Sequence, residues 1–116
     1  MFDEFELTQT LEGAMADYDE AIKTSRRSLD ARTRAQYEYL VARADRIRTL
    51  RADGQPSIVL KDLADGTPEV AKLKCDYEYR CDDYKLDLEV VQKSKRDVDI
   101  LREQLQREYR HAAARP

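Results

Sequence analysis

The stretch GQPSIVLKDLADGTPE, residues 54–69, divides the chain into two long runs that contain almost no glycine or proline. Gly54 and Pro56 are residues at which a helix ends. Thr67–Glu69 then supplies a capping oxygen, a proline at the first helical position and an acid in the first turn, a combination typical of a helix start. The stretch therefore predicts that one long helix ends here and a second begins.

A short helix is expected between these two signals. Ser57 can cap it, and Gly66 can close it. The sequence thus predicts a first long helix over residues 11–52, a short connecting helix over 57–65 and a second long helix over 68–112. We expect residues 1–116 to form one domain.

Apolar and small residues recur every three or four positions through both long runs, as on one face of an amphipathic helix. In the first run this stripe is Leu11, Met15, Tyr18, Ile22, Ser25, Leu29, Thr33, Gln36, Leu40, Ala44 and Ile47. In the second run it is Val70, Leu73, Tyr77, Cys81, Tyr84, Leu88, Val91, Ser94, Val98, Leu101, Leu105 and Tyr109. Heptad steps hold through Leu29, after which the first stripe takes an eleven-residue step to Leu40, so a local interruption of the heptad is expected.

The charges form four blocks along the chain. Residues 1–22 carry −7, residues 23–51 carry +6, residues 53–92 carry −5 and residues 93–116 carry +3, within a net charge of −3. Antiparallel helices bring opposite blocks together, whereas parallel helices bring like blocks together. The predicted fold is therefore all-α: a long antiparallel, coiled-coil-like helical hairpin with a short connecting helix, alone or doubled into a dimeric bundle.

The second long helix has a further apolar face, opposite its main stripe. It consists of Tyr79, Leu86, Val90 and Ile100, with Cys75 beside them. A helix that is apolar on two faces must bury both. Three coverings are consistent with the sequence: the chain's own short segments, a second copy in a homodimer, or a foreign protein. The candidate segments within the chain contain Phe2, Phe5, Leu7, Ile58, Leu60 and Leu63.

Two charged groups offer other surfaces. The basic group, a candidate for phosphate contacts, is Arg43, Arg46, Arg48 and Arg51. The acidic group, a candidate docking surface for a basic groove, is Asp76, Asp82, Asp83 and Asp87. For both groups a solvated helix face is the favoured interpretation, and the pI near 5.3 is unlike the basic footprint of a nucleic-acid-binding domain.

Catalytic and metal sites find no support in the residue pattern. His111 is the single histidine, and Cys75 and Cys81 stand six residues apart, so on a helix they point in different directions. We expect no catalytic residues, no metal and no cofactor, and hence no enzyme. We expect a cytoplasmic protein, because its thiols are free and its first residues are acidic where a signal peptide is basic. We expect no membrane span, because no apolar run approaches ~18 residues.

Residues 58–74 and 101–109 resemble small uncharacterised helical proteins of bacteriophages and integrated mobile elements. The resemblance implies a bacterial host cell and an accessory role in protein binding. The leading prediction is thus a non-catalytic interaction or scaffolding module whose partner is a protein, either itself or another. The alternatives are a nucleic-acid-binding accessory of replication or recombination, and an acidic inhibitor of a host nuclease or defence complex.

Overall fold

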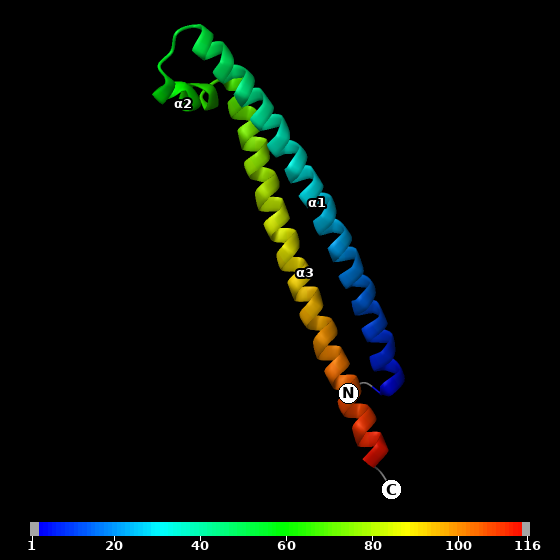
Figure 1. Ribbon diagram of the computed structural model, residues 1–116. Helices are drawn as coiled ribbons and strands as arrows, with labels where there is room; N and C mark the ends of the chain where they lie inside the picture. The colour runs from blue at the N-terminus through cyan, green and yellow to red at the C-terminus, as the bar shows by residue number, and fades with distance from the viewer. Residues whose placement is uncertain (1–2, 115–116) are drawn as a thin grey trace. The chain divides into compact units, whose positions relative to one another are not determined.

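The computed structural model describes residues 3–114, and all its regular elements are helical. Two long helices, α1 (Glu4–Ala52) and α3 (Pro68–Ala114), are joined by a 3-10 turn, η1 (Ser57–Val59), and a short helix, α2 (Leu60–Asp65) (Figure 1). The chain is an all-α helical hairpin, as predicted. No helix within residues 3–114 combines the length and the apolar composition of a membrane span.

The ends of α1 have local causes. The helix begins at Glu4, earlier than the predicted residue 11, because Asp3 and Glu6 form a reciprocal cap. The Glu6 backbone N–H donates to Asp3 Oδ1 at 2.8 Å, and the Asp3 N–H donates to Glu6 Oε2 at 3.3 Å. At the other end Gly54 has a φ of 87°, the left-handed conformation that commonly follows a helix.

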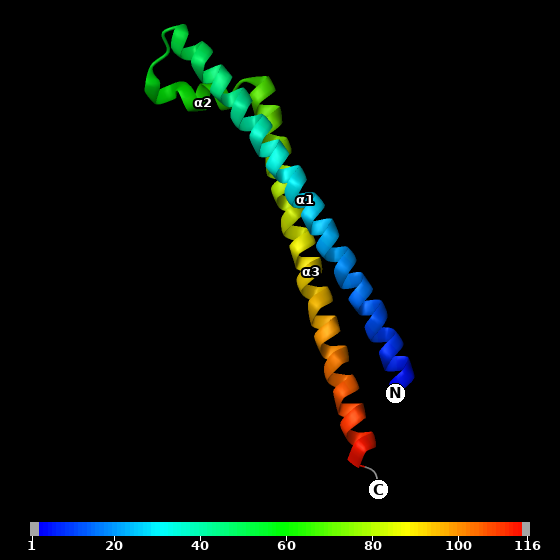
Figure 2. The ribbon, with the colours of Figure 1, turned by 45° about the vertical axis from the view of Figure 1, so that its right-hand side comes forward.

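The chain divides into two compact units. Unit 1 combines the residues up to Arg26 with the residues from Leu86 onward, and unit 2 is the continuous stretch Arg27–Lys85. In each unit a part of α1 lies beside a part of α3 that runs in the opposite direction (Figures 1 and 2). Unit 1 thereby combines the acidic start of α1 with the basic end of α3, and unit 2 combines the basic part of α1 with the acidic part of α3.

Unit 2 has an apolar core where α2 meets the end of α1. Leu50, Leu60 and Ala64 are buried together, with Ile47 packed against them. The Thr67 hydroxyl donates to the Leu63 carbonyl at 3.1 Å and accepts from Arg46 Nε at 3.2 Å. These bonds tie α2 and α1 to the residue that precedes α3.

Two side-chain contacts define the register of unit 2. The rings of Tyr39 and Tyr77 stack with centroids 6.1 Å apart, and the Arg32 guanidinium lies 4.9 Å from the Tyr84 ring centroid. A step of seven residues forward on α1 thus corresponds to a step of seven backward on α3. The heptad therefore continues through this part of α1.

The predicted interruption of the heptad after Leu29 is wrong. Ala35 and Tyr39 are buried, with Tyr39 only 6% exposed, whereas Leu40 is 46% exposed. Two other residues of the predicted step, Thr33 and Gln36, are exposed as well, and so is Ala44, the next residue of the predicted stripe. Tyr39 takes the inner position because its ring stacks on Tyr77 while its hydroxyl finds an acceptor, a combination that a leucine cannot offer. On α3, Leu88 and Tyr109 are also more exposed than the stripe predicted.

Candidate functional site

The outer face of α3 is uncovered in the structure. In unit 1 it consists of Leu86, Val90 and Ile100, which are 60%, 54% and 54% exposed. In unit 2, Tyr79 is likewise exposed. A single exposed apolar side chain is ordinary, but several on one face of one helix indicate a contact surface.

Within residues 3–114, the chain's own short segments do not cover this face. Leu60 is buried in the core of unit 2, and Leu7 is buried in unit 1, while Ile58 and Phe5 are themselves exposed. Phe2 lies outside the described residues. Among the described residues, therefore, no segment of the chain itself covers the outer face of α3, which leaves a second copy or another protein as its partner.

Two neighbouring grooves of unit 1 run along this face. Val90 lines a groove of about 250 Å³ with Ala21 of α1, and Ile100 lines one of about 480 Å³ with Gly13 and Ala14. Asp17 lines both grooves, so the two adjoin. Small residues on α1 leave open space opposite the α3 side chains, since a Cβ added at Gly13 meets nothing within 4 Å. Such a shallow channel between two helices can receive a third helix.

The four arginines proposed for phosphate contacts do not converge. Arg43 Nε lies 3.5 Å from an Asp65 carboxylate oxygen, and Arg46 donates to Thr67. Arg48 pairs with Asp45 on the same helix. Arg51 is exposed in the last turn of α1. Three of the four are thus engaged with protein partners within unit 2, where a phosphate site requires several free cationic donors.

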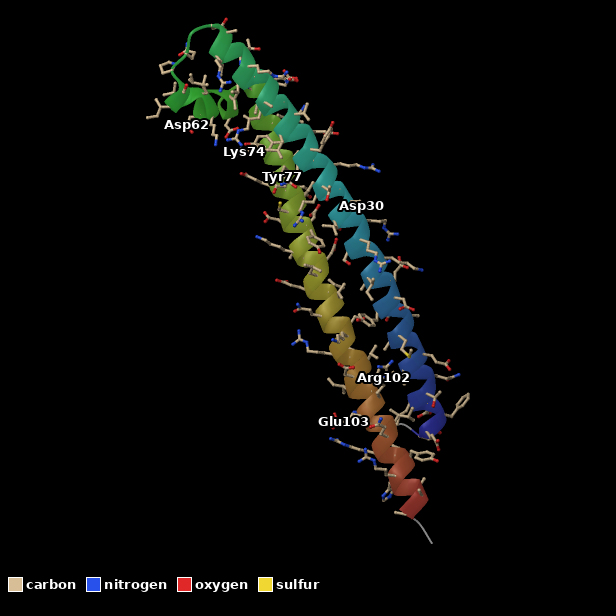
Figure 3. The ribbon with its side chains drawn as sticks, in the orientation of Figure 1. Asp30, Asp62, Lys74, Tyr77, Arg102 and Glu103 are labelled. Carbon is tan, nitrogen blue, oxygen red and sulfur yellow. The ribbon has the colours of Figure 1, made fainter. Side chains whose placement is uncertain are left out.

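A polar cluster centred on Asp65 was missed in the sequence. The Tyr39 hydroxyl donates to Asp65 Oδ1 at 2.8 Å, and Lys74 Nζ lies 3.7 Å from Asp65 Oδ2, on the side of α3 that faces α2 (Figure 3). Arg43 Nε is buried beside the same carboxylate without hydrogen-bond geometry, so its contact is one of charge. Burial, followed by the hydrogen bond to Asp65, raises the pKa of Tyr39 above its ordinary value. The cluster joins all three α-helices of unit 2, which indicates a structural role.

The aspartates proposed as a docking surface are also dispersed. Asp76 pairs with Arg80 at 3.7 Å, Asp82 is exposed, and Asp83 is half-buried. Asp87 belongs to unit 1, whereas the other three belong to unit 2. Within residues 3–114 no three His, Cys, Asp or Glu side chains gather as metal ligands would.

The two cysteines are not joined to each other. Cys75 is exposed and Cys81 half-buried, and both are free. The side-chain hydrogen bond between Tyr77 and Cys81 raises the pKa of Tyr77. A raised tyrosine pKa keeps the hydroxyl protonated at neutral pH, so Tyr77 cannot serve as a base that activates the thiol.

The structure shows one further apolar surface, which the apolar spacing of the sequence does not predict. Tyr37 and Val41 of α1 are exposed and line a groove of unit 2, and Leu40 beside them is exposed too. Their positions, three and four residues apart, form a short apolar stripe on a helix otherwise rich in charge. The predicted stripe places Leu40 in the core, so the exposed group of Tyr37, Leu40 and Val41 is not recognisable from the sequence.

Comparison with protein-family models, with curated proteins and with solved structures found no match to this chain.

Proposed function

We propose that this chain is a non-catalytic protein-interaction module whose contact surface is the outer face of α3. The observation that carries the proposal is the exposure of Leu86, Val90 and Ile100 along one groove-lined face of unit 1. Burial of such side chains against a partner contributes on the order of 1 kcal/mol or more for each. The occupant is a helix, supplied either by a second copy or by another protein.

The form of the surface supports a helical occupant. Gly13, Ala14 and Ala21 keep the α1 wall low, so another backbone can approach the hairpin closely. A third helix in this channel contacts both α1 and α3, and a second hairpin placed there completes a four-helix bundle. An accessory role of this kind is also what the resemblance to phage and mobile-element proteins implies.

Nucleic-acid binding is the less supported function. Arg43, Arg46 and Arg48 are engaged with Asp65, Thr67 and Asp45, respectively. Phosphate would have to compete with these contacts, and a net charge of −3 adds no long-range attraction.

The test is the double variant Leu86→Glu/Val90→Glu. Both side chains are exposed, so the variant should keep its helical content by circular dichroism and lose less than about 1 kcal/mol of stability. If a second copy occupies the face, light scattering shows a dimer for the wild type and a monomer for the variant. If another protein does, the mass is unchanged and a partner captured by the wild-type chain from host extract is lost.

A matched control is Gln92→Glu/Gln106→Glu, which adds two negative charges at exposed positions of α3 in unit 1 that lie on another side of the helix. The control should behave like the wild type in all assays. A Leu86→Glu/Val90→Glu protein identical to the wild type in mass and in captured partners would refute the proposal. Loss of every captured partner on nuclease treatment would favour nucleic-acid binding instead.

A further inference from the structure

A second surface, in unit 2 and on the other long helix, has the features of a binding groove. Its volume is about 460 Å³, and its walls come from α1 and from the start of α3. Val70 is buried at its base, while Tyr37, 70% exposed, and Val41 border it on α1. We call this cavity the Tyr37 groove. Because no described side chain covers Tyr37, a large amphipathic ring is free to contact a partner.

The polar border of the Tyr37 groove is acidic. Glu38 and Asp45 lie on α1, and Glu69 lies in the first turn of α3. Asp45 pairs with Arg48, whereas Glu38 and Glu69 have no ion pair among residues 3–114.

Among residues 3–114, Arg46 is the one cation that lines the groove. Arg46 Nε donates to the Thr67 hydroxyl at 3.2 Å, which holds the guanidinium against the wall. The groove thus combines an apolar anchor point with two carboxylates, Glu38 and Glu69, that have no ion pair among residues 3–114, and its three acids outnumber its one arginine. A partner complementary to it needs an apolar side chain flanked by lysine or arginine.

We propose that the Tyr37 groove binds a basic amphipathic helix of another protein. An apolar side chain of that helix contacts Tyr37 and Val41, and its cations face Glu38 and Glu69. A second copy of this chain fits less well, because a two-fold contact places the same patch on itself and brings like carboxylates together. The groove lies in unit 2, so this binding does not depend on the unit 1 face of α3.

The experiment uses the full-length chain and two labelled synthetic peptides. Both carry leucines at helical spacing along one face, with lysines at all other positions in the first and glutamates in the second. Binding is followed by fluorescence anisotropy at low and high salt. The lysine peptide should bind, more weakly as salt rises, and the glutamate peptide should not.

Matched variants locate the contact. Tyr37→Ala should weaken binding of the lysine peptide by at least about tenfold, as expected for an aromatic hot spot. Tyr79→Ala removes an equally exposed tyrosine from α3 of the same unit and should change binding less than about twofold. Glu38→Lys should weaken binding and reduce its salt dependence, whereas Asp82→Lys, the same charge change outside the groove, should do so much less.

Three results would overturn the proposal: no binding of the lysine peptide, equal binding of both peptides, or equal losses in Tyr37→Ala and Tyr79→Ala. A dimeric wild type that becomes monomeric in Tyr37→Ala would also overturn it, since the occupant would then be a second copy. Circular dichroism of each variant excludes unfolding as the cause of a loss. Leu86→Glu/Val90→Glu should bind the lysine peptide as the wild type does, which separates this site from the outer face of α3.

Discussion

Truncation of Tyr39 should be far more damaging than truncation of its neighbour Leu40. The heptad on α1 places Tyr39 inside unit 2, 6% exposed, and Leu40 outside, 46% exposed. A buried aromatic ring removes ~150 Å² or more from water, worth about 4 kcal/mol at ~25 cal/mol per Å². Part of this area is already buried in the unfolded chain, so about 3 kcal/mol is the expected cost of Tyr39→Ala.

The companion variants divide this cost. Leu40→Ala removes a side chain that is already half in water, so it should cost about 1 kcal/mol or less. Tyr39→Phe keeps the ring and its stacking on Tyr77 but deletes the hydroxyl that donates to Asp65. The carboxylate keeps Arg43 and Lys74 as neighbours, so the loss should be about 1 kcal/mol.

The assay is urea denaturation followed by far-ultraviolet circular dichroism, with the free energy of unfolding extrapolated to water. Similar slopes for all variants would show that the same surface unfolds in each. A Leu40→Ala variant as destabilised as Tyr39→Ala would refute the continuous heptad. It would favour the eleven-residue step that the apolar spacing alone predicted.

Three further predictions follow from the same contacts. Asp65→Ala should lower the free energy of unfolding by about 2 kcal/mol, because it leaves buried donors without their acceptor. Arg48→Ala, which breaks an exposed ion pair, should lower it by less than about 0.5 kcal/mol, and thermal melts compare the two variants. Because the pKa of Tyr39 is raised in the folded state, its contribution to stability is complete below its ordinary value of about 10 and is lost as pH rises past that value, so Tyr39→Phe should show a shallower alkaline decline of the melting temperature. Cysteines at Thr8 and Tyr109, which line one groove of unit 1, should be joined within one chain by a short bis-maleimide in a cysteine-free background, and adducts formed only between chains would contradict the antiparallel arrangement.

The hairpin could be predicted because its signals are local and agree with one another. Gly54 ends α1 and Pro68 opens α3, as their backbone preferences require. The charge blocks selected the antiparallel orientation without any knowledge of contacts. The apolar spacing places the start of α1 at Leu11, whereas Asp3 and Glu6, a capping pair that the sequence also offers, start the helix at Glu4.

The interior of unit 2 was harder to predict because it depends on a partner distant in sequence. Leucine is ordinarily the better core residue, so the apolar pattern favours Leu40 over Tyr39 as the buried position. The deciding contacts are the ring of Tyr77 and the carboxylate of Asp65, 26 residues from Tyr39. No periodicity encodes such a pairing. The same preference hides the Tyr37 groove, because the apolar spacing places Leu40 in the core.

Of the candidate surfaces, one could be located from the sequence and another could not. The outer face of α3 was predictable because Leu86, Val90 and Ile100 repeat at helical spacing and leave the main stripe free. The partners of the arginine group could not be predicted because cations crowded in sequence can each find a separate partner. Arg43 reaches Asp65 and Arg46 reaches Thr67, both far along the chain.

Site-specific photo-crosslinking at position 90 is the most direct test of the central claim, that the outer face of α3 contacts another polypeptide. A photoreactive amino acid replaces Val90 in one protein and Gln92, an exposed polar residue two positions along the same helix, in another. After irradiation in an extract of the cells that produce the chain, position 90 should give a discrete covalent adduct with a second copy or another protein, and position 92 should give much less. Equal labelling at the two positions, or no adduct at position 90, would contradict the claim.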